Sequence, residues 1–294
     1  MRKVIVAPLV TFLLAVIVVP LNAITGDWVK DFEHPFVGLA VFYDDTGEFL
    51  WRCSGTLLSP TVFLTAGHCA DTAGGAVSAR VYFQQDAGAH YDPVTQLDPV
   101  TGYPETCAAG TLGVTCATSV QIYNFDYTGL LPNTHDVGLL ILDQAITLSE
   151  YGQLAPVGTL DSLATSRGTK ETLFTVSGYG LTFKPNANAP LTTLSFRERL
   201  MAESTLVNLN SALNDGFNLQ TQGNGNARGG TCNGDSGGPV FLGPYSSNLV
   251  VAVTSFGLNT LCRGTDFAYR VDTAAVQAWM QEVLGPTLWD EIAP

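Results

Sequence analysis

Short apolar runs separated by turn-forming residues are the feature that most constrains the fold of this chain. Residues 61–66, 137–142 and 249–257 are such runs, rich in Val, Thr, Leu and Phe. The chain also holds 30 glycines and 15 prolines. Runs of this kind form strands, and glycine and proline form the turns between them. The sequence therefore predicts a mostly β fold.

The size and charge of the chain limit its class and its partners. Its 294 residues, 46% of them hydrophobic, suffice for one large domain or two small ones with a substantial core. The net charge is −13, with only 13 lysines and arginines. Because negative charge repels phosphate groups, we expect neither a nucleic-acid partner nor binding to an anionic membrane surface.

The first residues have the pattern of a secretory signal peptide. Arg2 and Lys3 precede an apolar run at residues 4–19, and Pro20 breaks that run shortly before Ala23. We expect cleavage after Ala23 and a secreted protein with no membrane segment afterwards. The alternative is an uncleaved anchor, although the run is somewhat short of the ~20 residues that span a bilayer. In an exported chain, the six cysteines suggest three disulfides, whose connectivity spacing alone does not decide.

A glycine-rich loop carries the strongest chemical signal. It reads Gly234-Asp235-Ser236-Gly237-Gly238-Pro239. Glycine permits a tight loop, so Ser236 can stand exposed while neighbouring N–H groups converge on an oxyanion. A serine nucleophile of this kind needs a histidine to accept its proton and a carboxylate to orient that histidine.

Candidates for both helpers lie upstream, each beside a strand-like run. His68 follows residues 61–66, and Asp136 precedes residues 137–142. Each alone has an ordinary explanation: a buried core histidine, a turn carboxylate, or a glycine-rich loop without chemistry. Their joint occurrence in the order His, Asp, Ser favours a catalytic site.

These segments resemble the chymotrypsin/trypsin-like serine proteases. The motifs are Thr65-Ala66-Gly67-His68-Cys69, His135-Asp136-Val137-Gly138-Leu139-Leu140 and the Ser236 loop, in the order that this family uses. We identify the chain as a secreted, bacterial-type member. The resemblance runs from Ile24 to about Gly285 and is poor between 87 and 132, which we interpret as a surface excursion. Acidic residues there could hold calcium, but the EF-hand pattern is absent and a solvated loop is favoured.

The resemblance implies an all-β fold of two packed six-stranded antiparallel β-barrels, chymotrypsin-like, with a C-terminal α-helix. The barrels would occupy about 24–145 and 146–271, and the helix about 272–284. We expect Asp272 to cap this helix and Gly285-Pro286 to end it, which leaves 286–294 as a tail.

The resemblance also implies the roles of the site residues in a serine endopeptidase. Ser236 would be the nucleophile that forms an acyl-enzyme, His68 the general base and Asp136 the residue that orients His68. The main-chain N–H groups of Gly234 and Ser236 would bind the oxyanion. No metal or cofactor is expected. Protein or peptide substrates, and possible protein inhibitors, are the expected partners.

The substrate pocket implied by the resemblance has several wall residues, which are Gly230, Thr231, Asn233, Ser255, Phe256 and Gly257. Gly230 stands where trypsin-like enzymes carry a pocket-floor aspartate, which argues against simple trypsin specificity. Asp266 either enters the pocket from the opposite wall, where it could pair with a Lys or Arg substrate, or lies on the surface.

Two further features follow from the resemblance. The implied disulfides are Cys53–Cys69 and Cys232–Cys262, which leaves Cys107 with Cys116. Family members usually expose a new amine by proteolysis, which pairs with the carboxylate before the nucleophile, here Asp235. Because Ile24 follows the expected signal site directly, we expect signal cleavage itself to free the activating amine, with no separate zymogen.

Two other functions stay open from the sequence. One is a binding protein on a protease scaffold that has lost catalysis, because fold does not dictate function. The other is an esterase that uses the same three residues. A strand at 255–257 that pairs with an extended peptide would favour peptide substrates.

Overall fold

The computed structural model describes residues 24–87, 103, 107, 116–164, 171–183, 198–223, 228–258 and 262–294. The expected signal peptide, with its cleavage site at Ala23, lies outside the described residues, as does most of the excursion between 87 and 132 that precedes residue 116.

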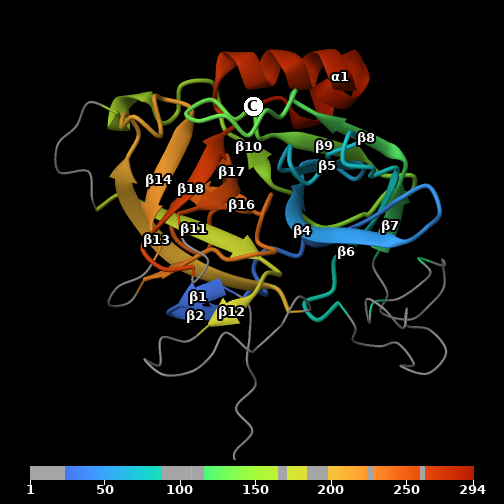
Figure 1. Cartoon of the computed structure of the whole chain (residues 1–294), viewed down its shortest axis with the longest axis horizontal. Coiled ribbons are helices and arrows are strands. Elements are labelled where there is room, and N and C mark those ends of the chain that lie inside the picture. Colours follow the sequence, from blue (N-terminus) through green and yellow to red (C-terminus); the bar gives the residue numbers. More distant parts are fainter. Residues whose placement is uncertain are drawn as a thin grey trace, which may run out of the picture.

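The first half of the chain forms an antiparallel sheet in the order β7-β6-β3-β4-β5-β9-β8 (Figure 1). Its strands are β3 (Val37–Tyr43), β4 (Phe49–Leu57), β5 (Val62–Thr65), β6 (Ser78–Tyr82), β7 (Cys116–Ser119), β8 (Gln121–Asn124) and β9 (Gly138–Ile141). Only Val120 separates β7 from β8; β7 pairs with β6 and β8 pairs with β9. One bent strand thus joins the two ends of the sheet, and within the described residues the barrel has six strands.

The second half forms another closed antiparallel sheet, in which β17 pairs with both β16 and β18. Its strands are β11 (Leu173–Gly178), β13 (Leu200–Asn208), β14 (Asn218–Gln222), β16 (Pro239–Leu242), β17 (Leu249–Gly257) and β18 (Thr265–Arg270). The short β10 (Gln153–Leu154) adds to β17 in parallel, and the 3₁₀ helix η1 (Asp161–Leu163) follows it. The expected fold class, two six-stranded barrels, is confirmed.

The N-terminal strands do not belong to the first barrel, to which we assigned them. The strand β2 (Trp28–Lys30) pairs with β13 of the second barrel. The strand β1 (Ile24–Gly26) lies between β12 (Thr182–Phe183) and β15 (Gly229–Gly230) in a small sheet of its own. Strands this short depend on their partners for stability, so their own sequence did not reveal where they pair.

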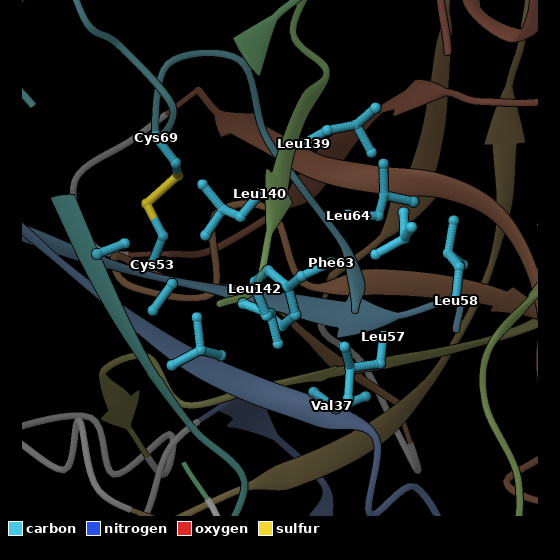
Figure 2. Packing of buried hydrophobic residues seen from close by; sticks show 14 of the residues in the cluster. Val37, Cys53, Leu57, Leu58, Phe63, Leu64, Cys69, Leu139, Leu140 and Leu142 are labelled. Carbon is cyan, nitrogen blue, oxygen red and sulfur yellow. A yellow bond between two sulfur atoms is a disulfide. The ribbon is translucent and has the colours of Figure 1, made fainter. Parts of the chain in front are cut away.

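The first barrel is filled by close-packed apolar side chains (Figure 2). Phe63, Leu64 and Leu140 are completely buried, and the Cys53–Cys69 disulfide lies at the edge of the cluster. Gly55 faces the Phe63 ring so closely that a Cβ there would lie 2.3 Å from a ring carbon. Each such buried side chain contributes about 1.5–3 kcal/mol relative to an exposed one. A separate apolar cluster, which includes Ile24, fills the second barrel.

The chain ends in the helix α1 (Ala274–Ile292), which begins two residues after the expected start at 272. Thr273, not Asp272, caps it, because the Thr273 side chain accepts the N–H of Val276. The Asp272 carboxylate is instead held by the guanidinium of Arg270 and the N–H of Leu160. Because these donors hold both of its oxygens, the Asp272 carboxylate does not cap the helix.

The helix also extends further than expected. Gly285 has φ 64° and ψ 176°, so the helix breaks there, as the Gly285-Pro286 sequence predicts. Helical structure nevertheless resumes and continues to Ile292, which is buried, so most of the expected tail is helical. Val276 and Met280 are fully buried in the first cluster, as their helical spacing indicates. Among the described helices, none is both long and apolar enough to cross a bilayer.

Candidate active site

His68 and Asp136 meet because their strands are neighbours. Thr65, at the end of β5, pairs with Gly138, at the start of β9. The chain leaves β5 through Gly67, whose missing Cβ would lie 2.9 Å from the carbonyl of His135. The His68 Nδ1 lies 2.9 Å and 3.0 Å from the two Asp136 carboxylate oxygens, and the His68 main-chain N–H donates to Oδ1 at 2.8 Å.

This contact sets the protonation of both groups. Burial would raise the pKa of Asp136, but the His68 charge and hydrogen bonds from His68 and Ser255 hold it below its usual range. Burial opposes a charge on His68, yet the Asp136 carboxylate, with a smaller contribution from Asp71, raises the His68 pKa above 6.5. The His68 side chain keeps 28% of its surface exposed, so the ring is partly open to solvent.

The loop with Ser236 is tied to the first barrel by Ser54. The Ser54 N–H donates to the Ser236 carbonyl at 2.8 Å, and its hydroxyl donates to the Gly234 carbonyl at 2.9 Å. Gly237 has φ 78°, and a Cβ there would lie 2.6 Å from the main-chain nitrogen of Ala66. The serine loop therefore packs against the residues that lead directly into His68.

A cavity of about 230 Å³ opens beside Ser236. Six of the expected substrate-binding residues line it, namely Thr231, Asn233, Ser255, Phe256, Gly257 and Asp266. Gly230 does not line the cavity but lies behind Asp266, since a Cβ on Gly230 would be 2.2 Å from the Asp266 Oδ2. Asp266 thus occupies the cavity wall and not the outer surface, which decides between the two alternatives that the sequence left open.

Asp266 is 7% exposed, and its carboxylate is held by the N–H of Thr231 at 2.8 Å. Burial raises its pKa to about 7, because the hydrogen bonds from Thr231 offset only part of the desolvation cost. The carboxylate rests on Gly223 and Gly230, where any side chain would collide with it. Near neutral pH this group can therefore take up or release a proton, or pair with a cation.

The main-chain N–H groups of the serine loop differ in whether they have a hydrogen-bond partner. The N–H groups of Asp235, Gly237 and Gly238 donate to carbonyls of Cys232, Thr254 and Asp235, respectively. Within the described residues, the N–H groups of Gly234 and Ser236 donate to no other group. Both are therefore available to a ligand beside Ser236.

The two residues of the expected activation pair, Ile24 and Asp235, have separate hydrogen-bond partners. Asp235 is fully buried and accepts the N–H groups of Gly180 and Cys232 at 2.8 and 2.9 Å. Burial, with the nearby Asp266 charge, raises its pKa to about 7. Ile24 is buried in the second core, and Thr182 donates a hydrogen bond to its carbonyl. No hydrogen bond or ion pair joins Ile24 to Asp235 in the described part of the chain.

The structure contains three disulfides, which join Cys53 to Cys69, Cys107 to Cys116 and Cys232 to Cys262. Cys53, Cys69 and His68 lie close enough to bind a metal ion, but both sulfurs are already used in the disulfide and the His68 Nδ1 faces Asp136. These three residues therefore do not form a usable metal site.

Two contacts at the site go beyond what the sequence predicted. The Ser255 hydroxyl, expected only as a pocket wall, also donates to the Asp136 carboxylate. Ser54, which the sequence did not indicate as a site residue, anchors the serine loop through its hydroxyl. Its neighbour Cys53, predicted to form a disulfide with Cys69, was the sequence feature nearest to it.

Comparison with known proteins now identifies the family. The model of the trypsin family, described as "Trypsin", matches residues 32–280. The chain belongs to the trypsin family. As a member, this trypsin-family protein is a serine endopeptidase, a hydrolase.

Its relatives include several named proteases. A chymotrypsin from Phaedon cochleariae is 28% identical over 239 residues, which cover 80% of this chain and 73% of the relative. A brachyurin from Leptuca pugilator is 29% identical over 230 residues, which cover 76% of this chain and 81% of the relative. A chymotrypsin-like elastase from Felis catus is 25% identical and covers 84% of each chain.

A solved structure described as HL collagenase at 1.7 Å resolution matches with a TM-score of 0.60 and 18% identity, covering 89% of this chain and 98% of that one. This likeness supports the fold of the trypsin-family chain. The relatives come mostly from insects and mammals, so they do not support our expectation of a bacterial-type member.

Proposed function

We propose that this chain is a secreted serine endopeptidase that acts through Ser236, His68 and Asp136. The observation that carries the proposal is the contact between the His68 ring and the buried Asp136 carboxylate, with the Ser236 loop packed against the same turn. Ser236 lines a cavity of a size suited to one side chain.

The proposed reaction has two halves. The His68 Nε2 takes the proton of the Ser236 hydroxyl as its oxygen attacks the peptide carbonyl carbon. The N–H groups of Gly234 and Ser236 stabilise the resulting oxyanion. His68 then gives the proton to the departing amine, which leaves an acyl-enzyme. Water, deprotonated by His68, releases the acid product and restores Ser236. Asp136 keeps the ring oriented and stabilises its charged form throughout.

The direct test is labelling of Ser236 by a fluorophosphonate, followed by peptide hydrolysis. Labelling that Ser236→Ala abolishes, together with cleavage of peptides, supports the proposal. A protein that neither reacts nor cleaves would be a binding protein on this fold. Turnover of esters without any peptides would favour an esterase. The end of β17, at Ser255–Gly257, borders the cavity and could pair with an extended peptide, which supports peptide substrates.

We propose that Asp266 selects substrates with a Lys or Arg side chain before the cleaved bond. A cation in the cavity would give this buried carboxylate its missing counter-charge. Since burial raises the pKa of Asp266 to about 7, binding of cationic substrates should strengthen as the pH rises through neutrality. Asp266→Ser should reduce turnover of an Arg ester relative to a Phe ester by at least about tenfold, as expected for a lost bond to a charged group. An unchanged ratio would exclude this role.

We also propose that secretion and activation are one step. Cleavage after Ala23 would free an amine on Ile24, with an ordinary pKa of about 7.7–8.0. Pairing with Asp235 would raise that pKa and lower the pKa of Asp235, and activity would be lost at alkaline pH as the amine deprotonates. N-terminal sequencing of the secreted, active protein should start at Ile24; another start would reject this step.

Protein inhibitors that occupy the cavity beside Ser236 are further proposed partners.

A further inference from the structure

A second aspartate–histidine pair lies outside the candidate site. Asp31 and His34 are both completely buried, and the His34 Nδ1 lies 3.0 Å from each Asp31 carboxylate oxygen. The Asp31 Oδ1 also accepts the main-chain N–H groups of Glu33 and His34. The proposed mechanism makes no use of this pair.

This pair cannot act as a second catalytic pair. The His34 Nε2 faces the carbonyl of Ser247 at 3.3 Å, and the ring stacks on Phe241 at 4.4 Å. The nearby hydroxyl of Ser177 donates to Asp31, at 2.5 Å, and not to the ring. No surface of the ring is left for a substrate, so another role must explain a buried charge of this kind.

Arg199 joins this pair to the first barrel. Its guanidinium, 3% exposed, donates to the carbonyls of Val37 at 3.1 Å and Phe83 at 3.0 Å, which belong to the first barrel and the segment after β6. The same side chain donates to the Asp31 carbonyl at 3.2 Å and the Tyr179 hydroxyl at 3.2 Å, on the second-barrel side. The planar fork of an arginine suits such a bridge between fixed carbonyls. We call Asp31, His34, Ser177, Tyr179 and Arg199 the seam cluster.

The end of β11 connects the seam cluster to the serine loop. Side chains alternate between the two faces of an extended segment. Ser177 and Tyr179 point into the seam cluster. Gly178 and Gly180 face the other way: a Cβ on Gly178 would lie 2.4 Å from the Asp235 Oδ1, and the Gly180 N–H donates to that oxygen at 2.8 Å.

Main-chain contacts reinforce this connection. The Tyr179 N–H donates to the Ser54 hydroxyl at 2.9 Å, and Ser54 in turn holds the carbonyls of Gly234 and Ser236. The Ser177 carbonyl lies against Gly238, where a Cβ would be only 2.4 Å away. The segment 177–180 therefore contacts the seam cluster on one face and the serine loop on the other.

We propose that the seam cluster is a positioning device that sets Ser236 against His68. His68 belongs to the first barrel and the serine loop to the second, so their separation depends on how the barrels are joined. Arg199 fixes that junction, and Asp31 fixes both Arg199 and Ser177. The inference rests on the proposed function, because the quantity that it controls is the rate of attack by Ser236. Misplacement of about 1 Å by a distant change can cost about 10²-fold in rate.

The test compares two buried Arg–Asp pairs. Asp31→Asn and Arg199→Met break the seam cluster, and Arg199→Lys keeps the charge. The matched control is Asp272→Asn, because Asp272 is also completely buried and bonded to a buried arginine, Arg270. The hydrogen-bond partners of that pair do not include residues 177–180 or the serine loop. The thermal unfolding midpoint is measured for each variant. The kcat and KM on a peptide substrate are then measured at a temperature well below that midpoint.

We expect Asp31→Asn and Arg199→Met to lower kcat by about tenfold to a hundredfold with KM changed less than about twofold. Arg199→Lys should recover part of the lost kcat. Asp272→Asn should lower the midpoint and leave kcat within about twofold. Ser177→Ala, which removes only one hydroxyl, gives the same comparison if Asp31→Asn does not fold.

The outcomes separate the two proposals. If Asp31→Asn, Ser177→Ala and Asp272→Asn lose stability alike while all keep their kcat, the seam cluster only stabilises the fold and the inference is wrong. If the unaltered protein, processed to its mature N-terminus, is itself inert towards peptides, the proposed function fails and the positioning role fails with it.

Discussion

The molecule contains two aspartate–histidine pairs with nearly the same internal geometry and opposite surroundings. The Nδ1–carboxylate distance is 2.9 Å in His68–Asp136 and 3.0 Å in His34–Asp31. The His68 side chain is 28% exposed beside a cavity, whereas His34 is sealed between Phe241 and a carbonyl. The contact between imidazole and carboxylate is therefore not what makes a site reactive. What differs is that the ring of His68 is partly exposed, whereas the ring of His34 is enclosed on all sides.

The charges around the two carboxylates differ as well. Burial would raise the pKa of both Asp31 and Asp136, and in both the neighbouring histidine and a serine hydroxyl overcome that effect and lower it. Asp31 has a permanent cation nearby, since Arg199 lies 3.9 Å from its Oδ2. The charge that lowers the Asp136 pKa comes from His68. The field of Asp136 is thus available to stabilise an imidazolium that forms during a reaction.

Removing the imidazole from each pair should separate the two roles most strongly. We expect His68→Ala to lower kcat by about 10⁵- to 10⁶-fold, because a serine nucleophile without its base retains only the effects of binding and the oxyanion site. His34→Gln should leave more than about a tenth of the activity, since His34 acts on Ser236 only at a distance. Circular dichroism of each variant corrects each rate for the folded fraction. Comparable losses in both variants would contradict the assignment.

The carboxylate that orients the base should give the next largest effect. Asp136→Asn should lower kcat by about 10⁴-fold, because the amide favours the wrong imidazole tautomer. KM should change little, since Asp136 lies behind the ring and does not reach the substrate. Steady-state kinetics on one peptide substrate measures both constants. A loss below about tenfold would mean that His68 is oriented by other groups.

The sequence predicted that His68 and Asp136 lie together because each stands beside a strand whose pattern is visible locally. The runs at residues 61–66 and 137–142 are both apolar and short, and their strands β5 and β9 pair in the structure. The second pair has no such local signal. Asp31 and His34 lie in a segment without regular structure, and Ser177 and Arg199 are 146 and 168 residues away from Asp31. No local sequence pattern predicts a contact across such a separation.

Competition for the carboxylate explains why the predicted helix cap was wrong. Asp272 has the right residue type for a helix cap, but the guanidinium of Arg270 and the N–H of Leu160 take its carboxylate, and Thr273 caps the helix. The sequence alone did not place Asp266, because its alignment slips easily by one residue.

In the structure, Asp266 of β18 pairs with Thr221 of β14, and its carboxylate lies against Gly223 and Gly230. Strand register is set by such tertiary contacts and cannot be deduced from one strand alone.

Stability should reverse the ranking of the two histidines. His34→Gln should lower the free energy of unfolding by about 1–3 kcal/mol, because it leaves part of a buried carboxylate without a donor. His68→Gln should change it by less than about 1 kcal/mol, since that side chain is partly exposed and solvent can replace its bonds. Urea unfolding at neutral pH, with an unchanged slope in both variants, measures the difference. Equal losses would mean that burial does not distinguish the pairs.

The smallest effect that still distinguishes the pairs is a shift in pH dependence. The Asp136 carboxylate, and to a lesser degree Asp71, raise the His68 pKa above 6.5. Because only the neutral ring can accept the Ser236 proton, kcat/KM for a Phe ester, which does not depend on Asp266, should fall on the acid side with a midpoint above 6.5. Asp71→Asn should move that midpoint to lower pH, and Asp136→Asn should move it further, measured on its residual activity. His34→Gln should leave the midpoint in place, because the ring of His34 does not take part in the proton transfer. If His34→Gln shifted the midpoint and Asp71→Asn did not, the titrating group would not be His68. His68 would then not be the base.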